Sequence, residues 1–182
     1  MKTIFLADDL WQPRPVCADA RLRGWLLDRG SLTRRIQSRC DRFSLVMLSQ
    51  RLAPIGQDER AMLGVRPREQ CVVREVSLNC ARRPLVFAHS VIKARALRGE
   101  WRELATLGGR PLTVPLFADP RVKRLPLRFC LLNRRHELYR RACGLIAPPP
   151  PYLWARRSLF VLRRSRLLVT EVFLPAILTP IP

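Results

Sequence analysis

The chain has 182 residues, and 48% of them are hydrophobic, so it is long enough for one domain with a real core, and its composition argues against intrinsic disorder. Its 34 Lys and Arg residues outnumber its 14 Asp and Glu residues, which gives a formal net charge of +20. A field of this sign attracts anions, whether nucleic acid, acidic lipid or a small polyanionic metabolite.

Nothing in the sequence predicts a membrane span or a secretory signal. No stretch approaches the roughly 18 apolar residues of a transmembrane helix, and the apolar run before Asp8 is too short for a signal peptide. We therefore expect a cytoplasmic protein.

The six cysteines are scattered without a CxxC pair or another metal-binding spacing, and the chain has only two histidines to assist them. In a reducing cytosol such cysteines behave as small buried hydrophobes rather than as zinc ligands or disulfide partners. We predict this for all six, Cys17, Cys40, Cys71, Cys80, Cys130 and Cys143.

The first half of the chain combines helical spacing with apolar runs typical of strands. Leu22, Trp25 and Leu26 recur at helical spacing, and Ser31 is suited to cap a second helix behind Gly30. Two later apolar runs are separated only by the residues ARR, which is hairpin spacing. The predicted elements are helices over 18–29, 31–40 and 57–64, a strand over 43–51, and a hairpin of strands 70–80 and 84–93.

The second half contains one more helix and one more hairpin. The pattern predicts a helix over 99–108 closed by a glycine pair, an extended proline-containing loop over 110–117, a strand over 123–132, a surface excursion over 133–152, and a hairpin of 153–162 with 166–175. Together the elements predict an α+β fold, an antiparallel sheet of about six strands with helices packed on one side. We see no internal repeat and no interior boundary, so we expect a single domain over 1–182 with its core at about 20–175.

Two charged side chains stand out because they lie on apolar strand faces. Side chains of a strand alternate between faces, so Glu171 shares one with Leu167, Val169 and Phe173, and Arg74 shares one with Val72, Val76 and Leu78. An unpaired charge taken out of water costs several kcal/mol, so each needs a partner, a ligand or solvent. Either the two residues form a buried structural ion pair, or both line a ligand cavity.

Other candidate residues give weaker evidence for a functional site. His89 shares a face with Phe87 and Val91, which favours a core or rim histidine, and His136 lies among arginines. The arginine pairs, such as 156–157, are most often solvated. The sequence has neither the phosphate-binding GxxxxGK[ST] motif nor GxGxxG, so nucleotide cofactors have no support.

Several segments match the pattern of a known family. They are VVREVSL (72–78), the RPL and LF of 110–117, LWARRSLF (153–160) and LLVTEVFLP (167–175). Together they resemble the chorismate pyruvate-lyase family, which eliminates pyruvate from chorismate and supplies 4-hydroxybenzoate for ubiquinone synthesis in bacteria. The resemblance runs from about residue 25 to 175. It implies an antiparallel sheet with flanking helices that encloses the aromatic product, and a reaction without cofactor or metal.

The resemblance also implies site residues. The family's ligand-contacting arginine falls on Arg74 and its glutamate on Glu171, and its two main-chain contacts fall on Leu32 and Leu112. Side chains at the last two positions can vary because any residue except proline supplies a backbone N–H. Arg74 would then anchor a carboxylate, and Glu171 would contact the ring hydroxyl and could assist proton removal.

Three positions depart from the family pattern. His89 stands where the family often has an arginine, Lys93 where a proline is common, and Thr113 where a glycine usually follows RPL. His89 is therefore the candidate second anion contact.

Two other classes of protein remain open. The fold also resembles the effector-binding domains of certain bacterial transcription regulators, so a non-enzymatic sensor of small aromatic acids is the main alternative. A nucleic-acid-binding protein is suggested by charge alone, without a motif, so we expect no specific nucleic-acid partner. The small molecule chorismate is the expected partner, the charge also favours peripheral contact with an acidic membrane, and we expect a monomer.

Overall fold

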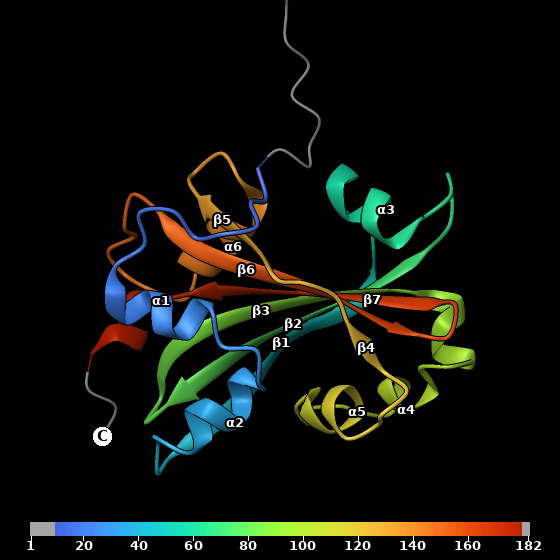
Figure 1. The fold of residues 1–182 in the computed structure, drawn as a ribbon, viewed down its shortest axis with the longest axis horizontal. Coiled ribbons are helices and arrows are strands. Elements are labelled where there is room, and N and C mark those ends of the chain that lie inside the picture. Colours follow the sequence, from blue (N-terminus) through green and yellow to red (C-terminus); the bar gives the residue numbers. More distant parts are fainter. Residues whose placement is uncertain (1–9, 180–182) are drawn as a thin grey trace, which may run out of the picture.

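The computed structural model describes residues 10–179, and the N-terminal run that we interpreted as too short for a signal falls largely outside this range. Its strands form one antiparallel sheet in the order β1-β2-β3-β7-β6-β4, and β5 also pairs with β6 (Figure 1). The strands are β1 (Phe43–Ala53), β2 (Cys71–Cys80), β3 (Arg83–Lys93), β4 (Lys123–Arg124), β5 (Arg128–Leu132), β6 (Leu153–Leu162) and β7 (Ser165–Phe173). The α+β class and the antiparallel sheet are confirmed.

The helices are short and cover both faces of the sheet, so our prediction that they pack on one side was wrong. They are α1 (Ala20–Leu26), α2 (Leu32–Gln37), α3 (Gln57–Leu63), α4 (Arg102–Ala105), α5 (Thr113–Phe117) and α6 (Glu137–Cys143), with 3₁₀ turns η1 (Ala94–Arg98) and η2 (Pro175–Leu178). Figure 1 shows α1, α2, α4 and α5 on one face and α3 and α6 on the other. Among residues 10–179 no helix is both long and apolar enough to cross a membrane.

Two hairpins form the centre of the sheet, as the sequence predicts. Hairpin β2–β3 pairs Arg74 with Ser90, and hairpin β6–β7 pairs Arg156 with Glu171. Strands β3 and β7 then pair with each other, which joins the two hairpins into one sheet. Because side chains alternate, this sheet has two inner faces, and apolar clusters pack on each of them.

Three segments of the second half differ from their predicted structure. The helix predicted over 99–108 is reduced to the short α4, preceded by η1, and the loop predicted over 110–117 contains α5. Pro115 is compatible with α5 because it lies in the first turn, where a helix needs no backbone N–H donor. The strand predicted over 123–132 is split into β4 and β5, with Pro126, which lacks an N–H, between them.

The segment 133–152 is not only a surface excursion. It contains α6, whose Leu138, Tyr139 and Ala142 are buried in the cluster that includes Leu132 and Leu153. The Tyr139 hydroxyl donates to the carbonyl of Pro150, which ties the proline run back to the helix. The arginines of this segment masked the apolar side of a short helix.

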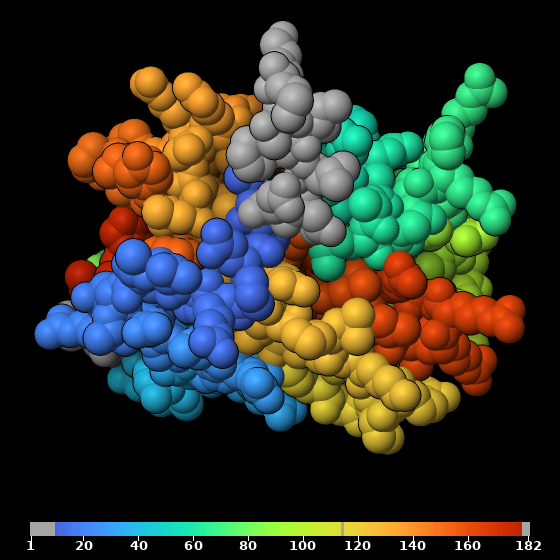
Figure 2. Space-filling model, turned by 45° about the horizontal axis from the view of Figure 1, so that its top comes forward, coloured from blue at the N-terminus to red at the C-terminus, as the bar shows by residue number. Residues whose placement is uncertain are grey.

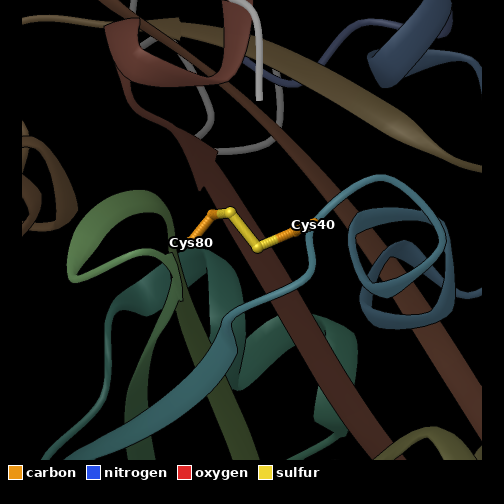
Figure 3. The surroundings of a disulfide bond; sticks show 2 residues. All are labelled: Cys40 and Cys80. Carbon is orange, nitrogen blue, oxygen red and sulfur yellow. A yellow bond between two sulfur atoms is a disulfide. The ribbon is translucent and has the colours of Figure 1, made fainter. Parts of the chain in front are cut away.

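A disulfide bond joins Cys40 and Cys80, so the prediction of six unpaired cysteines was wrong for these two (Figure 3). Cys80 ends β2, opposite Phe43 of β1, and the chain from α2 brings Cys40 beside it, with the two Cα atoms 5.9 Å apart. The sequence separation of 40 residues hid this proximity. Cys71 and Cys130 are buried thiols as predicted, whereas Cys17 is exposed.

Replacing both Cys40 and Cys80 by serine should lower the free energy of unfolding by about 2–4 kcal/mol, because the bond restricts the unfolded chain. Denaturant titration without reductant measures this difference. Cys17→Ser, at an exposed position, is the matched control and should leave stability within about 0.5 kcal/mol of the parent. Equal stability of the double variant and the oxidised parent would contradict the structural role of the bond.

Candidate active site

A partly enclosed cavity lies on the face of the sheet covered by α1, α2, α4 and α5. The centres of water-sized molecules can occupy about 60 Å³ of it, several times the space that one buried water needs. Its floor is formed by small side chains of the central strands, including Ala88, Ser90 and Ser158. Its walls come from the segments around Leu32 and Leu112.

Arg74 reaches this cavity from β2. Its residue exposure is 7%, and burial lowers the pKa of its guanidinium. Nη2 donates to the carbonyl oxygens of Gly108 and Arg110 at 3.0 and 2.9 Å, and the backbone of Gly108 takes the left-handed conformation (φ +53°) that glycine allows. Nε is buried and has no hydrogen-bond partner among the described residues. A buried donor without a partner costs free energy, so an anionic ligand is the natural acceptor.

Glu171 reaches the same cavity from β7, and it is held by Arg156 of the neighbouring strand β6. Arg156 Nε donates to Glu171 Oε2 at 2.5 Å. The guanidinium of Arg156 is fully buried, and its Nη1 also donates to the carbonyls of Trp25, Leu26 and Asp28 at the end of α1. Arg156 therefore fixes both the carboxylate and the C-terminal end of α1.

The two charges that alternation singled out thus line one cavity and do not pair with each other. Glu171 has Arg156 as its partner, and within residues 10–179 Arg74 donates only to main-chain carbonyls. Of the two interpretations left open by the sequence, the direct ion pair between Arg74 and Glu171 is excluded.

The predicted main-chain contacts lie at the starts of two helices. Leu32 is the first residue of α2, and Leu112 directly precedes α5. The first N–H groups of a helix have no partner within it, so they are available to an acceptor. A buried hydrogen bond of 2.9 Å between the hydroxyls of Ser31 and Thr113 holds these helix starts together. Thr113, which departs from the family pattern, thereby supplies a contact that glycine could not.

Sequence reasoning missed two further arginines on the cavity face of the sheet, Arg156 and Arg124. Arg156 and its neighbour Arg157 are 0% and 2% exposed, so our interpretation of this pair as solvated was wrong. The alternation test that found Arg74 applies equally to Arg156, which shares a strand face with Ser158 and Phe160, and would have found it. Arg124 lines the cavity from β4, and its place on a two-residue strand left no periodic signal.

His89, the candidate second anion contact, does not reach the cavity. It points to the opposite face of the sheet, where Nδ1 lies 3.0 Å from Glu75 Oε1 and Nε2 lies 3.0 Å from Glu59 Oε1. The second contact is an ion pair without good hydrogen-bond direction. Arg141 of α6 also donates to Glu75. His89 therefore belongs to a buried charge cluster under α3 and α6.

Burial alone would lower the pKa of His89, but its interactions with Glu59 and Glu75 outweigh burial and raise the pKa to about 9. An unfolded histidine titrates near pH 6.5. The stabilisation from protonated His89 is therefore complete below about pH 6.5 and is lost as the pH rises through about 9.

We predict that the free energy of unfolding falls between pH 6.5 and 9 by up to roughly 3 kcal/mol, and that His89→Gln removes most of this fall. Denaturant titrations of both proteins across the interval measure it. The exposed-thiol variant Cys17→Ser should keep the parent's slope. The same slope in His89→Gln would contradict a charged histidine between two carboxylates.

Within residues 10–179, no group of three or more His, Cys, Asp or Glu side chains is arranged to hold a metal ion. The chemistry of the cavity is instead that of two cationic arginines and one carboxylate around a small polar floor. Such a site suits an anion that also carries a hydroxyl.

Comparison with known proteins shows the family of this chain. The family model described as chorismate lyase matches residues 5–181. This chain belongs to the chorismate lyase family. A probable chorismate pyruvate-lyase of Nitrosospira multiformis is 50% identical over 92% of this chain and 94% of that protein. One from Aromatoleum aromaticum is 52% identical over 91% of this chain and 90% of that protein.

Solved structures of low sequence identity share the fold. The effector domain of PhnF from Mycobacterium smegmatis is 13% identical, covers 82% of this chain and 91% of its own, and gives a TM-score of 0.55. The ligand-binding domain of a putative GntR-family regulator from Bordetella bronchiseptica is 17% identical, covers 73% of this chain and 84% of its own, and gives 0.53. These likenesses show the fold alone.

Proposed function

We propose that this chain is a chorismate pyruvate-lyase, which eliminates pyruvate from chorismate and leaves 4-hydroxybenzoate, the aromatic precursor of ubiquinone. Family membership supports the reaction. The observation that carries the site is the buried, unpartnered Nε of Arg74 in a cavity that also contains Glu171. A ring carboxylate has the charge and the planar geometry that this guanidinium requires.

The proposed orientation of chorismate follows from the positions of Arg74 and Glu171 at the two ends of the cavity. The ring carboxylate binds Arg74, and the ring hydroxyl, which lies opposite that carboxylate, contacts Glu171. Arg156 occupies only Oε2 of Glu171, and the other oxygen has no partner among the described residues. The N–H groups of Leu32 and Leu112 supply the two main-chain contacts.

The chain's task is then to orient the substrate and stabilise moving charge. The bond between the ring and the enolpyruvyl oxygen breaks, and its electron pair stays with that oxygen. The hydrogen on the hydroxyl-bearing ring carbon leaves, and its electron pair completes the aromatic ring. The enolpyruvyl methylene carbon gains a proton to give pyruvate, either directly from the ring or through a base. Because aromatisation drives the step and the proton can pass directly from the ring, the reaction does not require a base. We therefore assign Glu171 the contact with the ring hydroxyl.

Wild-type protein incubated with chorismate should form 4-hydroxybenzoate and pyruvate in equal amounts. Chromatography measures the first product, and a pyruvate-coupled assay measures the second. A sensor domain of the same fold would bind an aromatic acid without turnover, and a nucleic-acid-binding protein would do neither. Absence of turnover in folded protein would contradict the proposal.

Arg74→Gln should lower kcat/KM for chorismate by about 100-fold, because a charge-assisted contact is worth about 1.5–3 kcal/mol. Glu171→Gln should lower it by about 10- to 100-fold for the same reason, whereas a general-base role would cost about 10²–10⁴ in kcat. Circular dichroism and thermal melts confirm that the variants fold.

Glu103→Gln, which alters a carboxylate outside the cavity lining, is the matched control and should keep full activity. Near-normal turnover in Glu171→Gln would rule out the base role, and it would contradict the expected loss of a charge-assisted contact to the ring hydroxyl.

We also propose that residues 1–182 form one domain that acts as a monomer. The excess of 34 basic over 14 acidic residues would raise the local concentration of a dianionic substrate, and it favours peripheral contact with an acidic membrane.

A further inference from the structure

Arg124 is a cavity-lining cation to which the proposed function gives no role. It is the second residue of the short strand β4 and pairs with Phe160 of β6. Strand β4 has only two residues, so the side-chain contacts of Arg124 add to its backbone pairing with β6. Figure 2 shows the segment that contains β4, in yellow, beside the blue N-terminal segment that Arg124 contacts.

The guanidinium of Arg124 is fixed on three sides. Nε donates to Ser158 Oγ at 2.9 Å, and Nη1 donates to the carbonyl of Arg29 at 2.6 Å. Its central carbon lies 5.3 Å from the ring centre of Phe160 and 5.6 Å from that of Phe117. Nη2 has no hydrogen-bond partner among the described residues. The guanidinium is therefore held in one orientation, and its Nη2 donors are available to an anion.

Strand register places Arg124 across the cavity from Arg74. Arg74 pairs with Ser90, Ser90 with Val169, and Val169 with Ser158. These four positions span three strand spacings, or about 14 Å, and Arg124 Nε binds the Ser158 end of the row. The two guanidinium groups therefore approach the small floor residues from opposite ends.

Glu171 lies on the Arg124 side of this floor. It is two residues along β7 from Val169, and it pairs with Arg156 of β6, the strand that also carries Ser158. Arg124 and Glu171 both line the cavity. Burial lowers the pKa of Arg124, and the negative charge of Glu171 opposes that shift. An anion bound near the carboxylate of Glu171 needs this nearby cation to offset repulsion.

We propose that Arg124 binds the second carboxylate of chorismate, the one on the enolpyruvyl group. This inference rests on the proposed function. With the ring carboxylate on Arg74 and the hydroxyl at Glu171, the neighbouring ether carbon also lies at the Glu171 end, so the enolpyruvyl group falls within reach of Arg124. When the ether bond breaks and its electron pair passes to the leaving oxygen, Arg124 stabilises the anionic leaving group. Arg124 thus replaces His89 as the second anion contact.

The test separates substrate from product, because 4-hydroxybenzoate lacks the second carboxylate. Arg124→Gln should lower kcat/KM for chorismate at least tenfold, while the Kd for 4-hydroxybenzoate, measured by calorimetry, changes less than threefold. Arg124→Lys should recover part of the loss. Arg121→Gln alters an exposed arginine of the same segment that pairs with Asp119, and it should match the parent in both measurements.

Arg74→Gln, in contrast, should weaken both turnover and product binding. Unchanged chorismate kinetics in Arg124→Gln would overturn the inference, and so would an equal loss of 4-hydroxybenzoate binding, which would mark Arg124 as a structural support. If Arg124→Gln does not fold, Arg124→Lys carries the same comparison. If the parent binds both compounds without turnover, the proposed function fails, whereas the inference is still tested by the ratio of their affinities.

Discussion

The buried ion pair between Arg156 and Glu171 is the interaction on which the cavity depends. Without a cation of its own, the carboxylate of Glu171 would be drawn to the nearest arginine that lines the same space. Arg156 lies directly opposite on the neighbouring strand and occupies one of its oxygens. Arg74, at the other end of the cavity, keeps its unpartnered Nε, and the space between Arg74 and Glu171 remains open to a ligand. The same guanidinium also holds the end of α1.

The central strands place two separate groups of charged residues on opposite faces of the sheet. Adjacent residues of β2 illustrate this, because Arg74 lines the cavity whereas Glu75 enters the cluster with His89 and Arg141. On the face covered by α3 and α6, carboxylates and cations pair with one another and stabilise the fold. On the cavity face, the cations outnumber the carboxylate, which suits a dianionic substrate. One alternating strand therefore serves both structure and binding.

Alternation in long strands predicted more of the structure than any other signal. Apolar runs at hairpin spacing predicted both hairpins, and alternation placed Arg74 and Glu171 on inner faces, because both patterns depend only on neighbouring residues. Alternation within one strand could not show whether His89 lies on the cavity face of the sheet, because that depends on the register between strands. Short elements failed for a related reason: α5 and β4 have too few residues to establish a period. The Cys40–Cys80 bond likewise depends on tertiary proximity.

A crystal structure with 4-hydroxybenzoate bound tests the central claim most directly. The account predicts that the ligand lies between Arg74 and Glu171, with its carboxylate accepting from the Nε of the arginine and its hydroxyl at the free oxygen of the glutamate, while Arg156 keeps its contact. Ligand density elsewhere, or a direct ion pair between Arg74 and Glu171 in the liganded protein, would contradict it.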